Sequence, residues 1–346
     1  MKNSQIGGQA LMEGVMMRNG GRYACTVRKT DGQLEQIVEK YQTIGGSDKL
    51  RQIPFLRGPV IFLDSMKLGM STLSWSANFF MEEEDSGSTP VMTKKEADPT
   101  QRVTAEEEAD PTQRVILSEG GEASEVEESH KQEAKKKPAS ESLTMAFSML
   151  LALALGIGLF LVLPTVLVKL MRGFVSSSLL VSLLEGLIRM VIFILYLILI
   201  SQMKEIKRVF MYHGAEHKSI NCIEHGLPLT VENAMKSSRF HKRCGTSFIL
   251  FTLLVSIFVG VFVPRDPLLL RIGLKLLLLP VVMSLSYEFI RLAGSTDNGL
   301  VCALSKPGLW LQRLTTREPD PDMLEVAIAS TEAVFDWQAW EDENFG

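Results

Sequence analysis

The chain has 346 residues, of which 46% are hydrophobic, and a formal net charge of −4. The negative charge is concentrated in one segment. Residues 82–142 hold 17 acidic and 8 basic side chains, a net charge of 8 − 17 = −9. The rest of the chain therefore carries −4 + 9 = +5. A mildly basic remainder suits the anionic cytoplasmic face of a membrane. No basic stripe with interleaved aromatic residues is present, so we expect no nucleic-acid partner.

Residues 1–53 predict a small β-rich unit. Residues 23–28 are typical of a strand, residues 29–32 carry the Asp-Gly signal of a hairpin turn, and residues 34–41 would form the returning strand. The glycine pairs near the N-terminus indicate tight turns or a close approach of two backbones. We expect this part to be cytoplasmic.

Residues 54–81 are apolar but carry Arg57, Asp64 and Lys67. Their uncharged part, residues 68–81, is too short to cross a hydrocarbon core about 30 Å thick. We therefore predict an amphipathic interfacial or re-entrant segment. A fifth membrane span here is the less favoured alternative, and it would move the N-terminal part to the other side of the membrane.

The acidic segment 82–142 contains no aromatic residue and is predicted to be a disordered linker. The unit EADPTQRV occurs in it twice, at residues 96–103 and 108–115. One interpretation is a recent duplication without a function. The other is a docking or kinase site at Thr100 and Thr112, where a phosphate would add charge that a protein partner could bind.

Four apolar runs follow, at residues 142–168, 177–203, 246–263 and 268–289. Runs of this length predict transmembrane helices. They pair into two helical hairpins, at residues 143–203 and 246–292. The predicted fold class is therefore a mainly α membrane protein with four spans, a small β-containing N-terminal part and a short helical C-terminal tail.

Basic residues set the expected orientation. They concentrate before the first run and between the second and third, which makes that side cytoplasmic and places both termini there. Arg271 and Lys275 are exceptions near the outer end of the fourth run, from which they could extend outward to the interface. Glu185 and Arg189 lie four residues apart inside the second run, where they could form a stabilising pair or a functional site.

The loop at residues 204–245 carries the strongest chemical signal. His213-Gly214-Ala215-Glu216-His217 is an H-x-x-E-H pattern, the reversed zincin motif. On a helix, His213 and His217 lie one turn apart on one face and could bind one divalent metal, with zinc the expected ion. Glu216 would be the catalytic base that acts on a water molecule.

Two histidines do not complete a metal site, since catalytic zinc takes three protein ligands. The further candidates are His241 and Cys244, spaced i,i+3, followed by Glu224 and His225. The alternative is that the histidines only bond backbone carbonyls or lipid headgroups, and that the cysteines are small buried apolar residues. An inverzincin peptidase is less favoured, because no downstream glutamate ligand can be identified.

Residues 293–346 predict a cytoplasmic tail with a short amphipathic helix. Asp320 followed by Pro321 fits an N-cap with proline at the first helical position. One face of this helix would hold Leu324, Ala327, Ile328 and Thr331.

Several separated motifs resemble the YqhQ-like family of bacterial membrane proteins, described as metal-dependent enzymes of unknown function. They are IGGQALMEGVMMR, IPFLRGPV, YHGAEHKSIN, HKRCGTSF and EPDPDMLEVAI. The resemblance covers nearly the whole chain except residues 82–142. It implies the bacterial plasma membrane and a metal site at His213, Glu216, His217 and His241. The family pattern has proline after the histidine matching His241, where this chain has Lys242, a difference that leaves the ligand role intact.

The favoured hypothesis is a metal-dependent membrane hydrolase that acts on a lipid headgroup or a membrane-bound peptide. The main alternative is a non-enzymatic scaffold or regulator with a structural metal and a partner-recruiting linker. A transporter would be favoured if Glu185, Arg189, Arg271 and Lys275 lined a cavity between the spans. The sequence leaves the oligomeric state open.

Overall fold

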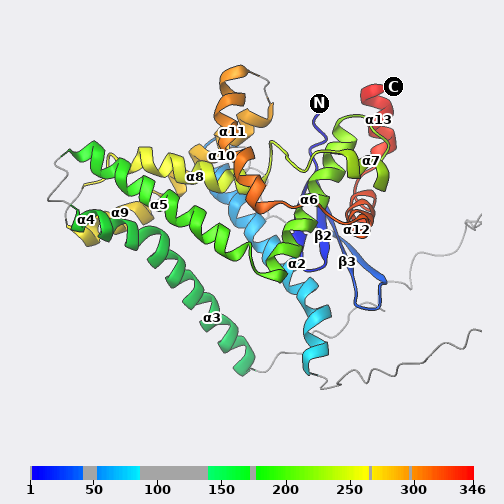
Figure 1. The fold of residues 1–346 in the computed structure, drawn as a ribbon, viewed down its shortest axis with the longest axis horizontal. Coiled ribbons are helices and arrows are strands. Elements are labelled where there is room, and N and C mark those ends of the chain that lie inside the picture. Colours follow the sequence, from blue (N-terminus) through cyan, green and yellow to red (C-terminus); the bar gives the residue numbers. More distant parts are fainter. Residues whose placement is uncertain (1, 42–52, 86–138, 172–176, 265–266, 296–297) are drawn as a thin grey trace, which may run out of the picture. The chain divides into compact units, whose positions relative to one another are not determined.

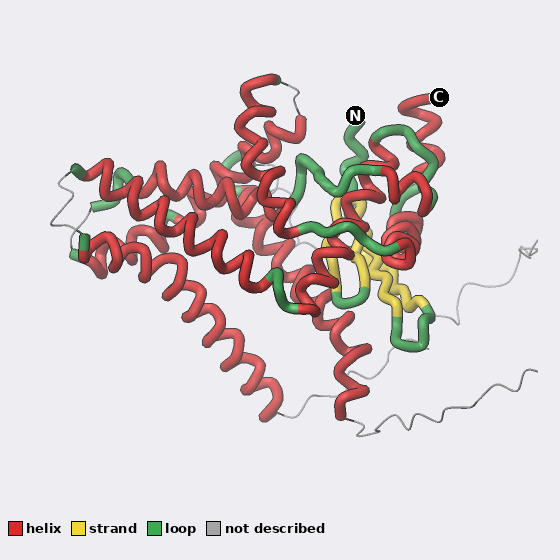
Figure 2. Tube along the Cα trace, viewed as in Figure 1, coloured by secondary structure: helices red, strands yellow, loops and turns green. Residues whose placement is uncertain are grey.

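The computed structural model describes residues 2–41, 53–85, 139–171, 177–264, 267–295 and 298–346. These residues are mostly helical and include one small sheet (Figure 2). The chain divides into two compact units, one of Met1–Ser86 with Ala154–Gly346, the other of Gly87–Leu153. The second unit contributes the first part of helix α3. The repeated EADPTQRV units, with Thr100 and Thr112, lie outside the described residues.

The strands all lie near the N-terminus, and helices follow them. The strands are β1 (Gly7–Leu11), β2 (Gly14–Asn19), β3 (Arg22–Arg28) and β4 (Leu34–Lys40). The helices are α2 (Arg57–Asp85), α3 (Ala139–Ile157), the π-helix η1 (Gly158–Val162), α4 (Leu163–Leu170), α5 (Ser178–Ile200), α6 (Lys204–Glu224), α7 (Val231–Lys236), α8 (Gly245–Gly260), α9 (Leu268–Leu277), α10 (Leu279–Ser295), α11 (Gly299–Thr315), α12 (Pro321–Glu332) and α13 (Trp337–Phe345).

The four strands form an antiparallel sheet in sequential order; the predicted hairpin corresponds to β3 and β4, and β1 and β2 are not predicted as strands by the sequence. The predicted Asp-Gly turn joins β3 to β4. Gly32 has a φ of +84°, which a side chain would disfavour, and the Asp31 carboxylate accepts a hydrogen bond from the backbone N–H of Gln33 at 2.9 Å. Local turn chemistry therefore sets the register of this hairpin.

Successive side chains of a strand point to opposite faces of the sheet. The middle strands β2 and β3 are buried on both faces, whereas most of β4 is exposed. Val15 and Met17 of β2 pack into a core with α6 and α12, while Met16 packs into a second core with Leu68 of α2. Figure 1 shows α6 and α12 beside strand β2. The sheet thus forms a support on which α6, the helix of the H-x-x-E-H pattern, is fixed.

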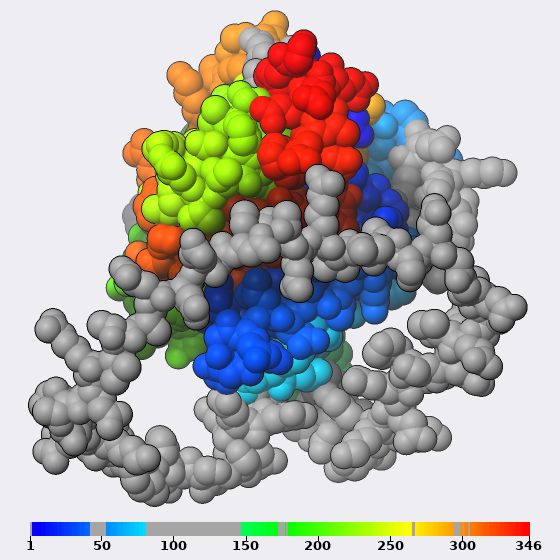
Figure 3. Space-filling model, turned by 90° about the vertical axis from the view of Figure 1, so that its right-hand side faces the viewer, coloured from blue at the N-terminus to red at the C-terminus, as the bar shows by residue number. Residues whose placement is uncertain are grey.

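Helix α12 begins at Pro321 with Asp320 at its N-cap, as predicted, although the Asp320 side chain makes no capping hydrogen bond. The Ser330 hydroxyl donates to the carbonyls of Val15 at 3.1 Å and Ala24 at 3.0 Å, which ties α12 to the sheet. In Figure 3 the C-terminal residues lie beside the yellow-green residues around α7, which α12 also contacts. The tail is therefore an integral part of the core around α6.

Two helical stretches, Phe147–Leu170 and Leu179–Ile200, are long and apolar enough to cross a membrane. A third candidate is the pair Leu268–Leu277 and Leu279–Ala293, which bends by 43° at its break. The apolar helix Gly245–Gly260, at the third predicted span, has 16 residues, or about 24 Å at 1.5 Å per residue. Large apolar side chains such as Leu199 (69% exposed) and Phe258 (67% exposed) line these helices, which indicates membrane association.

The charged residues of the apolar helices turn inward. Glu185 accepts from Arg189 at 3.2 Å, from Arg271 at 2.7 Å and from Lys275; Glu185, Arg189 and Arg271 are buried and Lys275 is partly buried. The expectation that Arg271 and Lys275 extend outward is therefore wrong, because the Glu185 carboxylate attracts both. Among the described residues, these groups border a cavity of only about 10 Å³, room for roughly one water molecule.

Candidate metal centre

The H-x-x-E-H histidines lie on helix α6, on the predicted shared face. Residues 201–203 separate α6 from α5, so the helix does not directly continue the preceding apolar helix. The imidazole rings of His213 and His217 have their centroids 4.4 Å apart in an edge-to-face arrangement. One helical turn therefore brings the two rings together, as the spacing indicates.

Cys244 approaches the two histidines from another element. It is the N-cap residue of α8, and its Sγ lies 3.3 Å from Nε2 of His213. One ligand atom from each of His213, His217 and Cys244 can be chosen so that all three lie within 4.8 Å of one another. Among the described residues, this is the group of histidine, cysteine and acidic side chains with metal-site geometry.

Backbone carbonyls fix both imidazole rings. Nδ1 of His213 donates to the carbonyl of Thr315 at 2.8 Å, and Nδ1 of His217 donates to the carbonyl of Arg239 at 2.7 Å. A carbonyl can only accept, so the proton of a neutral ring lies on Nδ1 and the lone pair on Nε2. Metal-binding histidines in proteins are typically oriented by such a second hydrogen bond.

The charges in the cluster are coupled. Burial would raise the pKa of the Cys244 thiol, but the neighbouring His213 and His217 hold it well below its usual range. Burial would lower the pKa of His213, but the nearby Cys244 and Glu216 raise it to about 9. Without a metal, these shifts favour a thiolate on Cys244 beside a protonated His213. A cation that replaces the imidazolium proton would meet a negatively charged sulfur.

Glu216 is buried next to this cluster, against the first strand. Burial raises the pKa of its carboxyl, an effect that His213 and His217 oppose, and it accepts a hydrogen bond from the backbone N–H of Gly8. A Cβ atom on Gly8 would lie 2.9 Å from the Glu216 carboxyl carbon. The close backbone approach expected for the N-terminal glycines is thus found at Gly8. Because Gly8 has no side chain, the Glu216 carboxyl group fits against the strand there.

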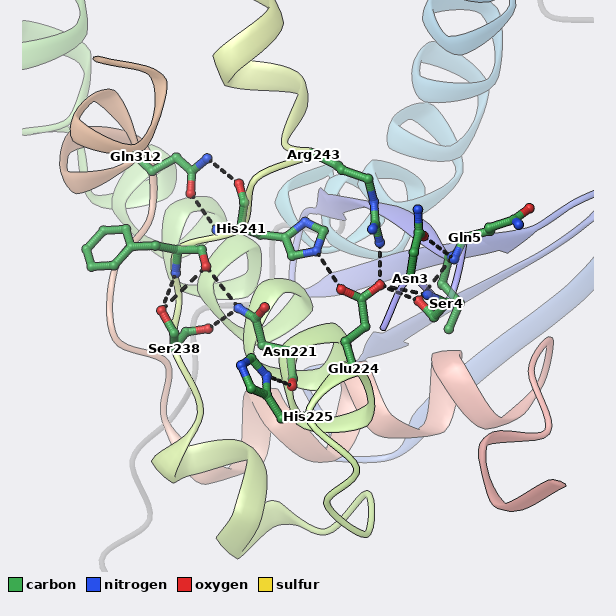
Figure 4. A network of polar contacts seen from close by, with 12 residues as sticks. Asn3, Ser4, Gln5, Asn221, Glu224, His225, Ser238, His241, Arg243 and Gln312 are labelled. Atoms are coloured by element: carbon green, nitrogen blue, oxygen red, sulfur yellow. Dashed lines mark hydrogen bonds and ion pairs between the residues drawn. The ribbon is translucent and has the colours of Figure 1, made fainter. Parts of the chain in front are cut away.

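Glu224 and His241, two of the predicted ligands, fall outside the group of three, although the His241 ring lies beside that of His217 with the centroids 5.7 Å apart. Both oxygens of Glu224 are engaged: one accepts from Ser4 N–H at 2.9 Å, Ser4 Oγ at 2.8 Å and Arg243, and the other faces Nε2 of His241 at 3.3 Å (Figure 4). Burial would raise the pKa of Glu224, but His241, Arg243 and Ser4 lower it to about 2. The pair therefore forms a charged anchor for the N-terminal residues.

His225 also lies away from the cluster, because its Nδ1 bonds the carbonyl of Asn221 at 2.7 Å within its own helix. Asn221 itself holds the segment before α8. Its amide donates to the carbonyls of Ser238 at 2.6 Å and Phe240 at 3.0 Å (Figure 4). Lys218, one turn earlier, donates to the carbonyls of residues 235 and 237 at 2.7 and 2.9 Å.

Lys218 and Asn221 of α6 thus hold in place the segment before α8. This segment carries the Arg239 carbonyl and leads into Cys244. Gln312 of α11 clamps the same segment, accepting from the backbone N–H of His241 and donating to its carbonyl. One sequence signal could have found the α6 residues: Lys218 and Asn221 are polar side chains spaced i,i+3 directly after the motif. No such signal exists for the Arg239 and Thr315 carbonyls, since every residue carries one.

These three residues could hold a divalent metal. From the ordinary Zn–N and Zn–S bond lengths, ligand atoms on a tetrahedral zinc lie roughly 3.3–3.6 Å apart. Cys244 Sγ and His213 Nε2 are 3.3 Å apart, and the ligand atoms of all three residues lie within 4.8 Å of one another. Two imidazoles and one thiolate are ligands that zinc prefers, and three protein ligands leave a fourth position for water or substrate.

We expect Cys244 to react with iodoacetamide faster than Cys25 at pH 7 in chelator-treated protein, because its thiolate form is favoured and, although it is only 5% exposed, it lines a cavity of about 450 Å³. Cys25 serves as the internal control: it is buried, burial raises the pKa of its thiol to about 12, and it should stay unmodified. Zinc should protect Cys244. Peptide mass spectrometry measures both sites, and labelling of Cys244 that zinc leaves unchanged would contradict a role as metal ligand.

Residues 53–337 match the model of a family described as "Protein of unknown function (DUF1385)". The chain is 34% identical to the uncharacterized protein YqhQ of Bacillus subtilis (strain 168), over 98% of this chain and 94% of that relative. No solved structure matches. His213, His217 and Cys244 all lie inside the matched range, whereas Gly8 precedes it.

Proposed function

This chain belongs to the DUF1385, YqhQ-like family, and on that premise we propose that it is a metal-dependent hydrolase of the bacterial plasma membrane. The observation that carries the proposal is the cluster of His213, His217 and Cys244, with both imidazoles oriented by carbonyls. Three ligands with an open fourth position are typical of catalytic zinc, whereas structural zinc usually has four.

The residues around the cluster have distinct roles in this proposal. A divalent cation would supply Lewis acidity and lower the pKa of water toward neutrality. Glu216, with its pKa raised by burial, is suited to take a proton from the attacking water and return it to the leaving group. The water oxygen then bonds to the electrophilic centre as the bond to the leaving group breaks, and no other reactant is consumed.

The membrane arrangement that we propose keeps four spans. The first two correspond to the two long apolar helices, and the fourth to the bent pair α9 and α10. The third would be α8, completed by residues up to Val263. Both termini and helix α6 would then face the cytoplasm, as the distribution of basic residues indicates.

The test is the zinc content of detergent-purified protein. We expect about one equivalent in the wild type and near-complete loss in His217→Ala, since removing one of three ligands leaves an incomplete site. Glu216→Gln keeps the shape of the side chain and removes the base, so it should keep the metal. Wild-type protein that holds no zinc when prepared without chelator would overturn the proposal.

Glu216→Gln also separates an enzyme from a scaffold with a structural metal. In an enzyme the variant keeps zinc and loses its cellular function, measured by complementation of a deletion strain. In a scaffold it keeps both. His225→Ala is the matched histidine control, because His225 lies on the same helix but bonds only its own backbone, and it should keep both zinc and function.

A further inference from the structure

An apolar cavity of about 450 Å³ lies directly beside the metal cluster. Helices α2 and α10 and the start of α8 form its walls, and Cys244 is one of its lining residues. Its size falls within the ~300–1,000 Å³ of ordinary ligand pockets. Because Cys244 belongs to both the cavity wall and the cluster, a molecule held in the cavity would end next to the proposed zinc.

A second cavity, of about 390 Å³, adjoins the first. Ile61 and Ser65 of α2 line both cavities. The second one is bordered by the first two strands and by Gly8, the residue that lies against the Glu216 carboxylate. The apolar cavity therefore adjoins a cavity of mixed lining, whose polar side chains are Gln5, Gln9, Arg18 and Ser65.

Resting on the proposed hydrolase function, we infer that the substrate is a membrane lipid whose acyl chain fills the apolar cavity and whose polar end reaches the cluster. Hydrogen-bonding side chains are few in that cavity: Ser65, Tyr287, Arg243 and Cys244, of which Arg243 pairs with Glu224 and Cys244 with His213. A peptide would bury backbone N–H and C=O groups there without partners. An alkyl chain has no such groups to satisfy.

The rim of the apolar cavity also fits a lipid. Met66 of α2 is 53% exposed and Ile249 of α8 is 45% exposed, so apolar side chains continue from the cavity onto the surface. Helix α8 is itself predominantly apolar. A lipid could therefore move from the bilayer into the cavity along apolar surface, without exposing its chain to water.

The experiment uses palmitic acid carrying a photoreactive diazirine on its chain. The full-length protein is reconstituted in vesicles of phosphatidylglycerol and phosphatidylethanolamine that contain this probe, and labelled peptides are identified by mass spectrometry. We expect labels on the cavity-facing parts of α2, α8 and α10. Met66→Trp should reduce this labelling about tenfold, because the indole occupies the space of the chain.

Leu63→Trp is the matched control. Leu63 lies on the same helix and is 50% exposed, close to the 53% of Met66, but it does not line the cavity. It should leave labelling unchanged. Labels spread evenly over the exposed apolar helices, with no difference between the two variants, would mean surface lipid only and would overturn the inference. A diazirine-bearing apolar peptide that labels the cavity while the fatty acid does not would overturn it in favour of a peptide substrate.

The zinc measurement keeps this inference distinct from the proposed function. If the protein binds zinc but shows no labelling in the cavity, the hydrolase proposal stands and the inference of a lipid substrate fails. Cavity labelling in His217→Ala, which should lack zinc, shows that the chain site does not depend on the metal. If the wild type held no zinc yet labelled in the cavity, the hydrolase would fail while the lipid site remained.

Discussion

Replacing Gly214 with alanine is expected to abolish zinc retention and to destabilise the protein by on the order of 3 kcal/mol or more. A Cβ atom at Gly214 would lie 1.9 Å from the carbonyl oxygen of Arg317, an impossible approach. The backbone N–H of Arg317 donates to the carbonyl of Phe210 at 2.8 Å, so this segment is bound along α6. Displacing it would also move the Thr315 carbonyl away from His213.

Gly245→Ala is the control for this substitution. Gly245 adjoins Cys244 and starts α8, but a Cβ atom there would meet nothing within 4 Å. The variant should keep zinc and equal or slightly exceed the wild type in stability, since glycine costs entropy in a helix. Zinc analysis and thermal unfolding in detergent measure both effects. A Gly214→Ala protein with full zinc and wild-type stability would refute the packing described for α6.

Replacing Glu185 with glutamine is expected to cost about 3–5 kcal/mol, because it leaves buried cations without their counter-charge. The carboxylate of Glu185 is 4% exposed and pairs with Arg189, Arg271 and Lys275. Glutamine keeps the size of the side chain but removes the negative charge. Unfolding in detergent should therefore occur at much lower temperature or denaturant concentration.

Two further variants test the cause of that loss. Glu185→Gln combined with Lys275→Met should recover part of the stability, since it removes one uncompensated cation. Glu232→Gln, at an exposed ion pair with Lys236, should change stability too little to measure. Equal effects of Glu185→Gln and Glu232→Gln would show that the buried network contributes nothing beyond a surface pair.

Where local chemistry determines the structure, the sequence predicts it well. The turn at residues 29–32 follows from Asp31 and Gly32, and helix α12 follows from Asp320 and Pro321. The apolar runs predict the two long helices, but periodicity does not reveal that the fourth run bends by 43°. The inward turn of Arg271 depends on Glu185, 86 residues away in sequence, and no local pattern carries that information.

The candidate site is also predicted by the sequence only where local spacing determines it. The i,i+4 spacing of His213 and His217 predicts their shared face, because both lie on one helix. In sequence, Cys244 and His241 look equivalent as ligand candidates, because they lie three residues apart at the end of the loop at residues 204–245. Tertiary contacts separate them: Cys244 meets His213, whereas His241 meets Glu224. Which candidate joins the cluster is therefore a property of the folded loop.

The chain's two ends meet around α6, which has a consequence for how the protein forms in the cell. Ser4 bonds Glu224, 220 residues later, and Ser330 bonds Val15, 315 residues earlier. The four strands are consecutive and can pair as soon as they emerge, but the face that α12 covers stays uncovered until α12 has been synthesised. At ~5–20 residues per second, that delay is roughly 15–60 s.

During this interval the sheet displays apolar side chains such as Val15 and Met17, which are fully buried in the finished protein. Nascent chains of this kind depend on chaperones for protection. A chain truncated before α12 would keep that face exposed permanently, so quality-control proteases should remove it even though its ligand residues are all present.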